Sequence, residues 1–231
     1  MSSLTRNFSN HIYHNDLLNK NDKILLAVSG GLDSLVMTNL FRNFRDKSDL
    51  NITLKAAHVN IAQVSLTNKQ KQQLNQIMDN WKIEFTIIPA KVPKEVDYGC
   101  YPCSKERRKE LFYYYDENNF DAIAFGHHKD DYIETGFMNL IRHGHLESLK
   151  SLDYMFDGVI KVIRPLLTAS KSNLRYYSNQ NDIEAVVNRD CKYADNSKRH
   201  EIRDYIKMID EDNPCFEANL YKAIQKFNQQ N

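Results

Sequence analysis

Apolar, β-branched runs alternate with segments of helical spacing over the first two thirds of the chain. Five of these runs predict strands, at residues 23–29, 52–59, 84–90, 121–127 and 158–166. Segments between the runs repeat their apolar positions every three or four residues, as in DSLVMTNLFRNF and NKQKQQLNQIMDNW, and predict helices. This alternation is typical of a parallel sheet with helices on both faces. We therefore expect an α/β fold with a doubly wound, mostly parallel five-stranded sheet.

The pattern changes after Pro165. Three helices are predicted over residues 170–181, 198–211 and 215–227, with no strand between the last two. We expect three parts in the chain. These are an N-terminal helical extension at 1–20, an α/β domain at 21–168 and a helical C-terminal segment at 169–231 that packs on the same domain.

Length and composition limit the class of protein. A chain of 231 residues suits one α/β domain with a small appendage. Because the net charge is only +1, a polyanionic partner must be met by local patches. No stretch approaches the roughly 20 apolar residues that span a bilayer, and the N-terminus lacks the apolar core of a signal peptide. We expect a cytoplasmic protein with no membrane partner, in which clustered cysteines serve metal or redox chemistry.

The segment SGGLDS, which begins at Ser29, follows the first predicted strand and opens the first predicted helix. Gly30 and Gly31 permit a tight turn whose amides point at a phosphate. The hydroxyls of Ser29 and Ser34 can bind phosphate oxygens, and Asp33 can hold Mg²⁺. A plain strand-to-helix turn capped by Asp33 is the alternative. Since ligands bind at the carboxyl ends of strands in open α/β sheets, this position favours a phosphate site.

A second polar cluster, GHHKDDYIET at residues 126–135, follows the fourth predicted strand. It supplies two imidazoles and three carboxylates. A metal site and a helix N-terminus that favours acidic residues both fit this composition. The adjacent His127 and His128 point in different directions on most backbones, which argues against a dedicated zinc site.

Cys100 and Cys103 have C-x2-C spacing at the start of a basic helix. A redox pair, half of a zinc site and half of an iron–sulfur site all fit that spacing. A structural zinc site would call for a second such pair or for spaced histidines, which the sequence lacks. Cys191 lies in a loop before a predicted helix, where it is either a ligand or a small buried hydrophobe. Cys215 matches no cluster position and is interpreted as an ordinary thiol, with a fourth iron ligand as the alternative.

These motifs resemble known families. SGGLDS resembles the loop of the PP-loop ATP pyrophosphatases, which cleave ATP between its α- and β-phosphates to activate a substrate as an adenylate. GHHKDDYIET looks like the GHHxDDxxET signature of the lysidine synthetases and the tRNA 2-thiolation enzymes, and IRPLLTASKSNL resembles their IRPL segment. Cys-x2-Cys before that signature and Cys-x-Tyr after it are similar to the tRNA 2-thiolation family, which contains the 2-thiocytidine and 2-thiouridine synthetases.

The resemblance implies an enzyme that adenylates the C2 oxygen of a tRNA pyrimidine and replaces it with sulfur, forming AMP and pyrophosphate. It implies a 4Fe-4S cluster on Cys100, Cys103 and Cys191 that delivers the sulfur. Mg²⁺ is expected at Asp33, and Asp130 joins the catalytic residues. The expected ATP-binding residues are Ala27, Ser29, Gly30, Gly31, Asp33, Ser34, His58, Gly126, His127 and Asp131.

The expected partners are tRNA and a sulfur donor protein or sulfide, and members of the family often form homodimers. Two basic stretches, SKERRKE and SKRHEIR, would meet the RNA through phosphate contacts that fix position without reading sequence. A solvated charged face is the alternative for such runs. The expected RNA-binding residues are Lys105, Arg107, Arg108, Lys109, Arg199 and Arg203.

One departure and two alternatives accompany this interpretation. Many 2-thiolation enzymes have a lysine where this chain has Leu32, so that either the phosphate contact is weaker or another cation compensates. A lysidine synthetase-like ligase shares the loop, the GHHxDD signature and an arginine-rich C-terminal segment, and needs no cysteine cluster. A zinc- or redox-stabilised nucleotide-binding module without catalysis is the second alternative.

Overall fold

The structure is a computed structural model that describes residues 3–93, 95–96, 98–187 and 198–230. Its strands are β1 Lys23–Ala27, β2 Thr53–Ile61, β3 Glu84–Ala90, β4 Ala122–Ala124, β5 Leu152–Met155 and β6 Ile160–Ile163. Its helices are α1 Ser3–His14, α2 Leu32–Arg45, α3 Asn68–Asn80, α4 Cys100–Glu117, α5 Lys129–His143, α6 Lys171–Gln180, α7 Lys198–Asp212 and α8 Phe216–Gln230, with a 3₁₀ turn at Ala62–Val64.

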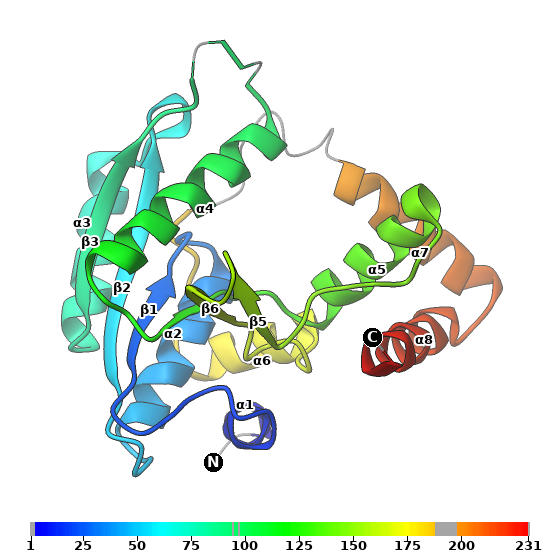
Figure 1. The fold of residues 1–231 in the computed structure, drawn as a ribbon, viewed down its shortest axis with the longest axis horizontal. Coiled ribbons are helices and arrows are strands. Elements are labelled where there is room, and N and C mark those ends of the chain that lie inside the picture. The colour runs from blue at the N-terminus through cyan, green and yellow to red at the C-terminus, as the bar shows by residue number, and fades with distance from the viewer. Residues whose placement is uncertain (1–2, 94, 97, 188–197, 231) are drawn as a thin grey trace.

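The strands form one sheet in the order β3-β2-β1-β4-β6-β5 (Figure 1). All neighbours are parallel except β5 and β6, which form an antiparallel pair. The predicted α/β class with a mostly parallel sheet is confirmed, but the sheet has six strands rather than the predicted five. The missed strand, β5, lies at the sheet edge and carries Asp153 and the exposed Tyr154. An antiparallel edge strand needs no continuous apolar run, so the sequence pattern did not reveal it.

Helices cover both faces of the sheet because successive side chains of a strand point to opposite faces. In β1, Ile24 and Leu26 pack into a cluster with apolar residues of α1, α2, α3 and α6. Leu25, between them, packs into a second cluster with Leu111 and Tyr115 of α4. β1 is therefore buried on both sides, as its unbroken apolar run indicates.

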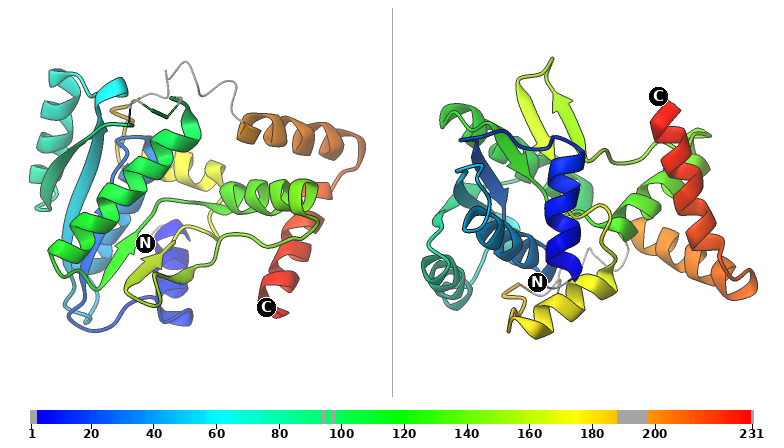
Figure 2. Two further views of the ribbon diagram at one scale, coloured as in Figure 1. Left: turned by 45° about the horizontal axis from the view of Figure 1, so that its top comes forward. Right: turned by 90° about the horizontal axis from the view of Figure 1, so that it is seen from below.

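The helices α7 and α8 pack on α5 and form a lobe beside the sheet (Figures 1 and 2). A third apolar cluster holds this lobe together, with Ile133 of α5, Ile202 and Ile206 of α7 and Ile224 of α8. The helical C-terminal part is thus confirmed, while the domain boundaries at residues 20 and 168 stay predictions. Within the described residues, none of the helices has the length and apolar character needed to cross a bilayer.

Candidate functional site

The strand order reverses between β1 and β4, and ligands of open α/β sheets bind at the carboxyl edge of such a point. The SGGLDS loop follows β1 and the GHHKDD segment follows β4, so the two motifs meet there. A Cβ atom on Gly126 would lie 3.3 Å from the backbone carbon and oxygen of Asp33. The two loops therefore approach more closely than a larger residue at 126 would allow. We call this region the nucleotide edge.

Gly30 needs to be glycine for two reasons. Its φ is +82°, in the left-handed region, and an added Cβ would lie 2.6 Å from Cγ2 of Val187. The Gly30 carbonyl accepts hydrogen bonds of 3.0 Å from the backbone N–H groups of Val186 and Val187. The described residues that follow α6 are thereby fastened onto the loop.

The N-terminus of α2 is open to a ligand. Its N-cap is Gly31, and no side chain caps it. The Ser34 hydroxyl donates to the Gly31 carbonyl over 2.8 Å, and the exposed Ser29 hydroxyl donates to Ser34 Oγ over 3.1 Å. A helix end whose first amides lack side-chain partners attracts anions, so this turn suits a phosphate.

Asp33 is the carboxylate at the centre of the nucleotide edge, and its side chain is 16% exposed. The ammonium group of Lys171, the first residue of α6, lies 2.6 Å from both Asp33 oxygens. Nε2 of His128 lies 3.7 Å from Asp33 Oδ2 and 3.5 Å from Asp131 Oδ2. The Lys171 backbone N–H also donates to Asp130 Oδ2 over 3.3 Å. One loop carboxylate is thus linked to residues of α5 and α6.

His128 caps α5 and fixes the acidic residues behind it. Its Nδ1 accepts a hydrogen bond from the Asp130 backbone N–H at 3.2 Å, so Nε2 carries the hydrogen. Asp131 accepts from the His128 backbone N–H at 3.0 Å. Burial alone would raise the pKa of Asp131, but His128, His127 and Arg199 together with this N–H hold that pKa below its usual value. Asp131 therefore stays ionised at neutral pH.

Two arginines of α7 reach the same helix. Arg199 lies 3.3 Å from Asp131 Oδ1 and donates to Thr135 Oγ1 over 3.3 Å. Nε of Arg203 donates to Glu134 Oε1 at 2.7 Å, and this hydrogen bond raises the pKa of the guanidinium. Both arginines were predicted to contact RNA phosphates. Their guanidinium groups are engaged with α5 in this structure, and the RNA contact stays a prediction.

His58 and His127 are neutral imidazoles at the nucleotide edge. Burial lowers the pKa of each to about 4, against a partial opposing effect of the Val28 carbonyl on His58 and of Asp131 on His127. His58 donates from Nδ1 to the Val28 carbonyl at 2.8 Å, just after the end of β1 at Ala27. Nδ1 of His127 is buried and has no hydrogen-bond partner within the described part of the chain. That atom is available to a bound ligand.

The cysteine pair begins α4, whose N-cap Gly99 has no side-chain cap. Cys100 is exposed, and Cys103 is half-buried against the apolar cluster under α4. Since α4 follows β3, this end of the helix lies toward the carboxyl ends of the parallel strands, as the nucleotide edge does (Figure 1). Cys191 lies outside the described residues. Across residues 3–93, 95–96, 98–187 and 198–230, no three His, Cys, Asp or Glu side chains gather as a metal site, so the cluster ligands stay a prediction.

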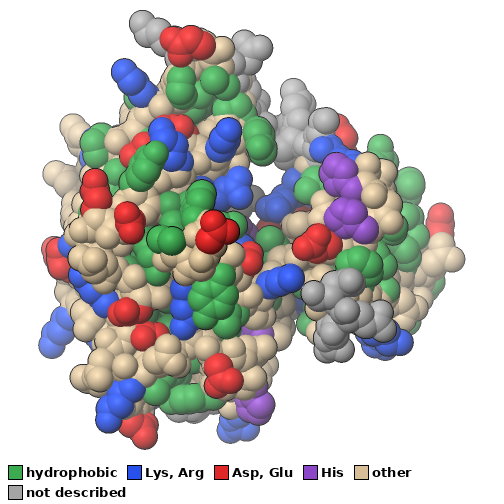
Figure 3. All heavy atoms as spheres, viewed as in Figure 1, with side chains coloured by type: hydrophobic (Ala, Val, Ile, Leu, Met, Phe, Trp, Pro, Cys, Tyr) green, Lys and Arg blue, Asp and Glu red, His purple; other side chains and the backbone are tan. Residues whose placement is uncertain are grey.

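The predicted RNA-binding cations of α4 have different surroundings. Lys105 and Arg108 are exposed, and Lys109 pairs with Glu106 at 3.0 Å. Arg107 is half-buried, and its positive charge contributes to the lowered pKa of His58. Lysine and arginine side chains gather around the hollow between the α4 side of the molecule and the lobe of α5, α7 and α8 (Figure 3). This arrangement places positive charge beside the nucleotide edge.

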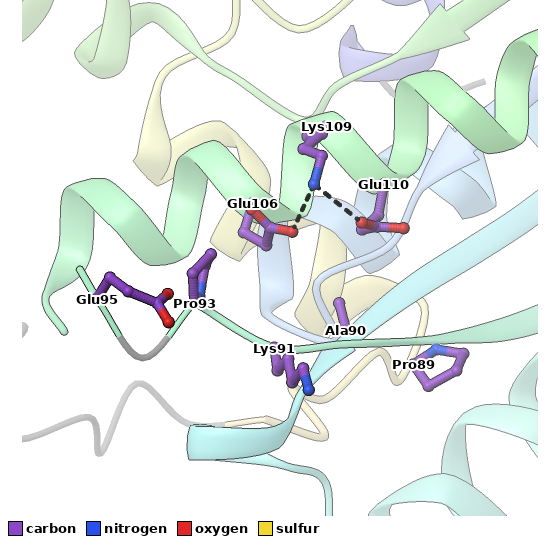
Figure 4. Close-up of a pocket in the computed structure, with 8 residues that line it drawn as sticks. All are labelled: Pro89, Ala90, Lys91, Pro93, Glu95, Glu106, Lys109 and Glu110. Carbon is purple, nitrogen blue, oxygen red and sulfur yellow. Dashed lines mark hydrogen bonds and ion pairs between the residues drawn. The ribbon is translucent and has the colours of Figure 1, made fainter. Parts of the chain in front are cut away.

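A separate pocket of about 530 Å³ lies between the end of β3 and α4 (Figure 4). Its lining combines Lys91 and Lys109 with Glu95, Glu106 and Glu110. Apart from Lys109, it contains none of the predicted site residues, and the ion pairs of Lys109 with Glu106 and Glu110 occupy one wall. We do not assign the nucleotide to this pocket.

Three residues at or near the nucleotide edge were not among those predicted from the sequence. They are Lys171, His128 and Arg164, whose buried guanidinium donates to the Lys150 carbonyl over 2.7 Å. His128 stood inside a recognised motif, and Lys171 and Arg164 inside the IRPL segment, so a signal was present. The contact between Lys171 and Asp33 could not be predicted from the sequence, because the two residues are 138 positions apart.

A glycine-rich loop and an acidic helix start at the switch point of a doubly wound sheet define a nucleotide-binding α/β protein. The PP-loop domain family matches residues 2–206, and the chain belongs to that family, as its motifs predicted.

Two curated relatives carry the name tRNA-cytidine(32) 2-sulfurtransferase. The first, tRNA-cytidine(32) 2-sulfurtransferase 1 of Francisella philomiragia subsp. philomiragia, is 27% identical over 216 residues, which cover 90% of this chain and 83% of that protein. The second, tRNA-cytidine(32) 2-sulfurtransferase 2 of Francisella tularensis subsp. novicida, is 26% identical over 213 residues, which cover 90% of this chain and 84% of that protein.

Solved structures share the fold. The U34-tRNA thiolase NcsA from Methanococcus maripaludis, with its 4Fe-4S cluster, superposes with a TM-score of 0.79 at 23% identity and covers 96% of this chain and 77% of that one. The NMN synthetase from Francisella tularensis gives a TM-score of 0.56 at 12% identity, with 90% and 87% covered. The likeness to NcsA includes the helical C-terminal part.

Proposed function

We propose that this chain is an ATP-dependent tRNA sulfurtransferase, which activates the C2 oxygen of a pyrimidine as an adenylate and replaces it with sulfur. The observation that carries the proposal is the meeting of the SGGLDS loop with the GHHKDD segment at one sheet edge, with the C-x2-C helix opening on the same side. The sulfurtransferase names of the relatives agree with this chemistry.

The nucleotide edge fits ATP. The uncapped first turn of α2 offers backbone amides to phosphate oxygens, and Ser29 offers a hydroxyl. The buried Nδ1 of His127 lacks a protein partner among the described residues and can bond the nucleotide. Asp33 and Asp130 supply carboxylate oxygens, the ligands that Mg²⁺ prefers. These groups would orient ATP with its α-phosphate toward the base.

Activation is a displacement at phosphorus. The pyrimidine oxygen forms a bond to the α-phosphorus while the bond from that phosphorus to the pyrophosphate oxygen breaks. Charge that develops on the departing pyrophosphate is stabilised by the helix N-terminus and by cations beside the loop. The chain contributes by holding the two reactants in line, since orientation alone lowers such barriers by several kcal/mol. AMP then serves as the leaving group at C2.

Cys100 and Cys103, with Cys191, would hold a 4Fe-4S cluster. Soft thiolate ligands suit iron–sulfur chemistry, and the exposed, uncapped start of α4 fits a group that must meet a bulky substrate. When bound, that cluster supplies the sulfur that displaces AMP. A sulfur donor protein or sulfide would replenish it. Residue Cys103, packed against the apolar cluster, fixes the direction in which the pair faces.

A tRNA would approach over the cations around the hollow of Figure 3. Lys105 and Arg108 project from α4 next to the cysteines, where phosphate contacts would position the substrate without reading its sequence. Because such binding releases counterions, its affinity falls steeply with salt. Pairing of two copies of the chain would extend the basic surface, and it remains part of the proposal.

The proposal is tested by the nucleosides of tRNA from cells that lack the gene. Mass spectrometry of digested tRNA should show the loss of one thiolated pyrimidine, and the gene should restore it. Anaerobically reconstituted protein should carry about four irons per chain and the visible absorbance of an iron–sulfur cluster. Loss of lysidine instead of a thiolated base would reject a sulfurtransferase, and a colourless, iron-free but active protein would reject the cluster.

A further inference from the structure

The ion pair between Lys171 and Asp33 joins two distant parts of the sequence at the nucleotide edge. Nζ of Lys171 lies 2.6 Å from both oxygens of Asp33, and the two side chains are 34% and 16% exposed. The ammonium group is thus held beside the phosphate loop yet open to solvent on one side. A ligand at the loop would meet it directly.

Lys171 is placed there by its backbone. Ser170 caps α6, and its hydroxyl accepts a hydrogen bond from the Asn173 N–H at 3.3 Å. The carbonyl of the buried Ala169 accepts from the Lys129 N–H at 2.9 Å, which ties this turn to the start of α5. The Lys171 N–H completes the connection through Asp130. The backbone of Lys171 is therefore fixed relative to the start of α5, and the ion pair with Asp33 holds the ammonium group at the loop.

The loop itself offers no cation. Leu32 is apolar, and its side chain packs against the apolar cluster that β1 forms with α1, α2, α3 and α6. The carboxylates of Asp33, Asp130 and Asp131 gather where a triphosphate would bind, so the phosphates need positive charge nearby. Arg199 and Arg203 are already paired with Asp131 and Glu134. Within the described part of the chain, Lys171 is the lysine or arginine that pairs with the loop carboxylate Asp33.

We propose that Lys171 is the cation that contacts the pyrophosphate end of ATP in this protein, in place of a side chain at position 32, and that Asp33 holds its ammonium group until the nucleotide binds. This assignment rests on the ATP site of the proposed function. It assigns Lys171 a role in binding the β- and γ-phosphates, which AMP lacks.

The test compares ATP with AMP. Isothermal titration of the full chain should give an ATP dissociation constant about tenfold or more weaker for Lys171→Met, with AMP binding changed less than about twofold. Lys171→Arg should retain ATP binding within about threefold, since it keeps the charge. The matched control is Arg175→Met, which removes one exposed charge from the same helix and should alter neither ligand.

Adding Leu32→Lys to Lys171→Met tests the substitution of one cation for another. The second change should recover most of the lost ATP affinity, because a lysine stem can lie along the apolar surface and carry its charge to the loop. Lys171→Gln is measured alongside, and thermal melting confirms that each variant is folded. Unchanged ATP binding in folded Lys171→Met and Lys171→Gln, or equal losses for ATP and AMP, would overturn the assignment. Failure of the unaltered chain to bind ATP would instead refute the proposed function, and this assignment with it.

Discussion

The nucleotide edge and the N-terminal end of α4, which carries Cys100 and Cys103, both lie toward the carboxyl ends of the parallel strands but are built differently. At the nucleotide edge, His128, the N-cap of α5, and Lys171 of α6 both lie against Asp33 of α2. At the start of α4, Cys100 is exposed, and Cys103 is only half-buried. The first region is assembled by the fold itself. The second presents reactive groups at a helix end.

This difference indicates how the two half-reactions are separated. Adenylation needs fixed orientation, which interlocked loops supply. Sulfur transfer needs thiolates that a large substrate and a sulfur donor can reach, and exposure supplies that. Changes at the two regions should therefore have separable effects on ATP use and on sulfur transfer.

The largest difference between the effect on sulfur transfer and the effect on ATP use is expected from Cys100→Ala and Cys103→Ala. Each should reduce tRNA thiolation by at least about 1,000-fold, because the sulfur-carrying group loses a ligand. ATP binding should stay within about twofold, since both cysteines lie on α4, outside the SGGLDS loop and the GHHKDD segment. Thiolated nucleoside, bound iron and ATP affinity are measured on each variant, with Cys215→Ala as the matched control. Retained thiolation in both α4 variants would contradict a role of Cys100 and Cys103 in sulfur transfer.

The converse change is Asp33→Asn. Pyrophosphate release in the presence of tRNA should fall about 100-fold, because the carboxylate that would hold Mg²⁺ beside the phosphates is lost. Bound iron should be unchanged. Asp79→Asn, an exposed change on α3, serves as the control. Loss of iron together with loss of pyrophosphate release would show that the two regions are not separable.

The packing of the phosphate loop is tested with two glycines. Gly30→Ala should lower the free energy of unfolding by about 3 kcal/mol, because φ is +82° and Cβ would lie 2.6 Å from Val187 Cγ2. Gly144→Ala has a φ of +72° with open space around the added Cβ, and should cost only about 1 kcal/mol. Urea denaturation measures both. Equal costs would mean that the contact with Val187 does not hold the loop.

The smallest effect is a pH dependence that the nucleotide edge should show. His58 has a pKa of about 4 in the folded chain, against about 6.5 for an unperturbed imidazole. As the pH falls below 6.5, the unfolded chain takes up a proton that the folded chain does not, so stability is lost. Between pH 7 and pH 5.5 this loss is about 1 kcal/mol. His58→Asn should remove this contribution of about 1 kcal/mol, while His127, whose pKa is also about 4, keeps its own. An unchanged slope would contradict the buried neutral imidazole of His58.

Much of the nucleotide edge could be predicted because its parts are local in the sequence. Gly30, Gly31 and Asp33 directly follow a buried strand, and GHHKDD follows another. The fold class followed from alternating strands and helices. The carboxyl ends of parallel strands meet at one edge, so the juxtaposition of the two motifs needed no further information.

The remainder depends on contacts between distant positions. The pairing of Lys171 with Asp33 spans 138 positions, and that of Arg199 with Asp131 spans 68. Nothing in a basic run such as SKRHEIR distinguishes a guanidinium that binds RNA from one that binds a neighbouring helix. The edge strand β5 was missed because its exposed face leaves no continuous apolar signal.

The central claim is that ATP use and sulfur insertion occur on one chain. Its most direct measurement is a reconstituted reaction with the anaerobic, iron-loaded protein, ATP, sulfide and unmodified tRNA, in which AMP, pyrophosphate and thiolated nucleoside are counted together. The account predicts one AMP and one pyrophosphate for each pyrimidine that exchanges oxygen for sulfur. Pyrophosphate release that depends on added lysine, or that proceeds with no sulfur entering the tRNA, would contradict it.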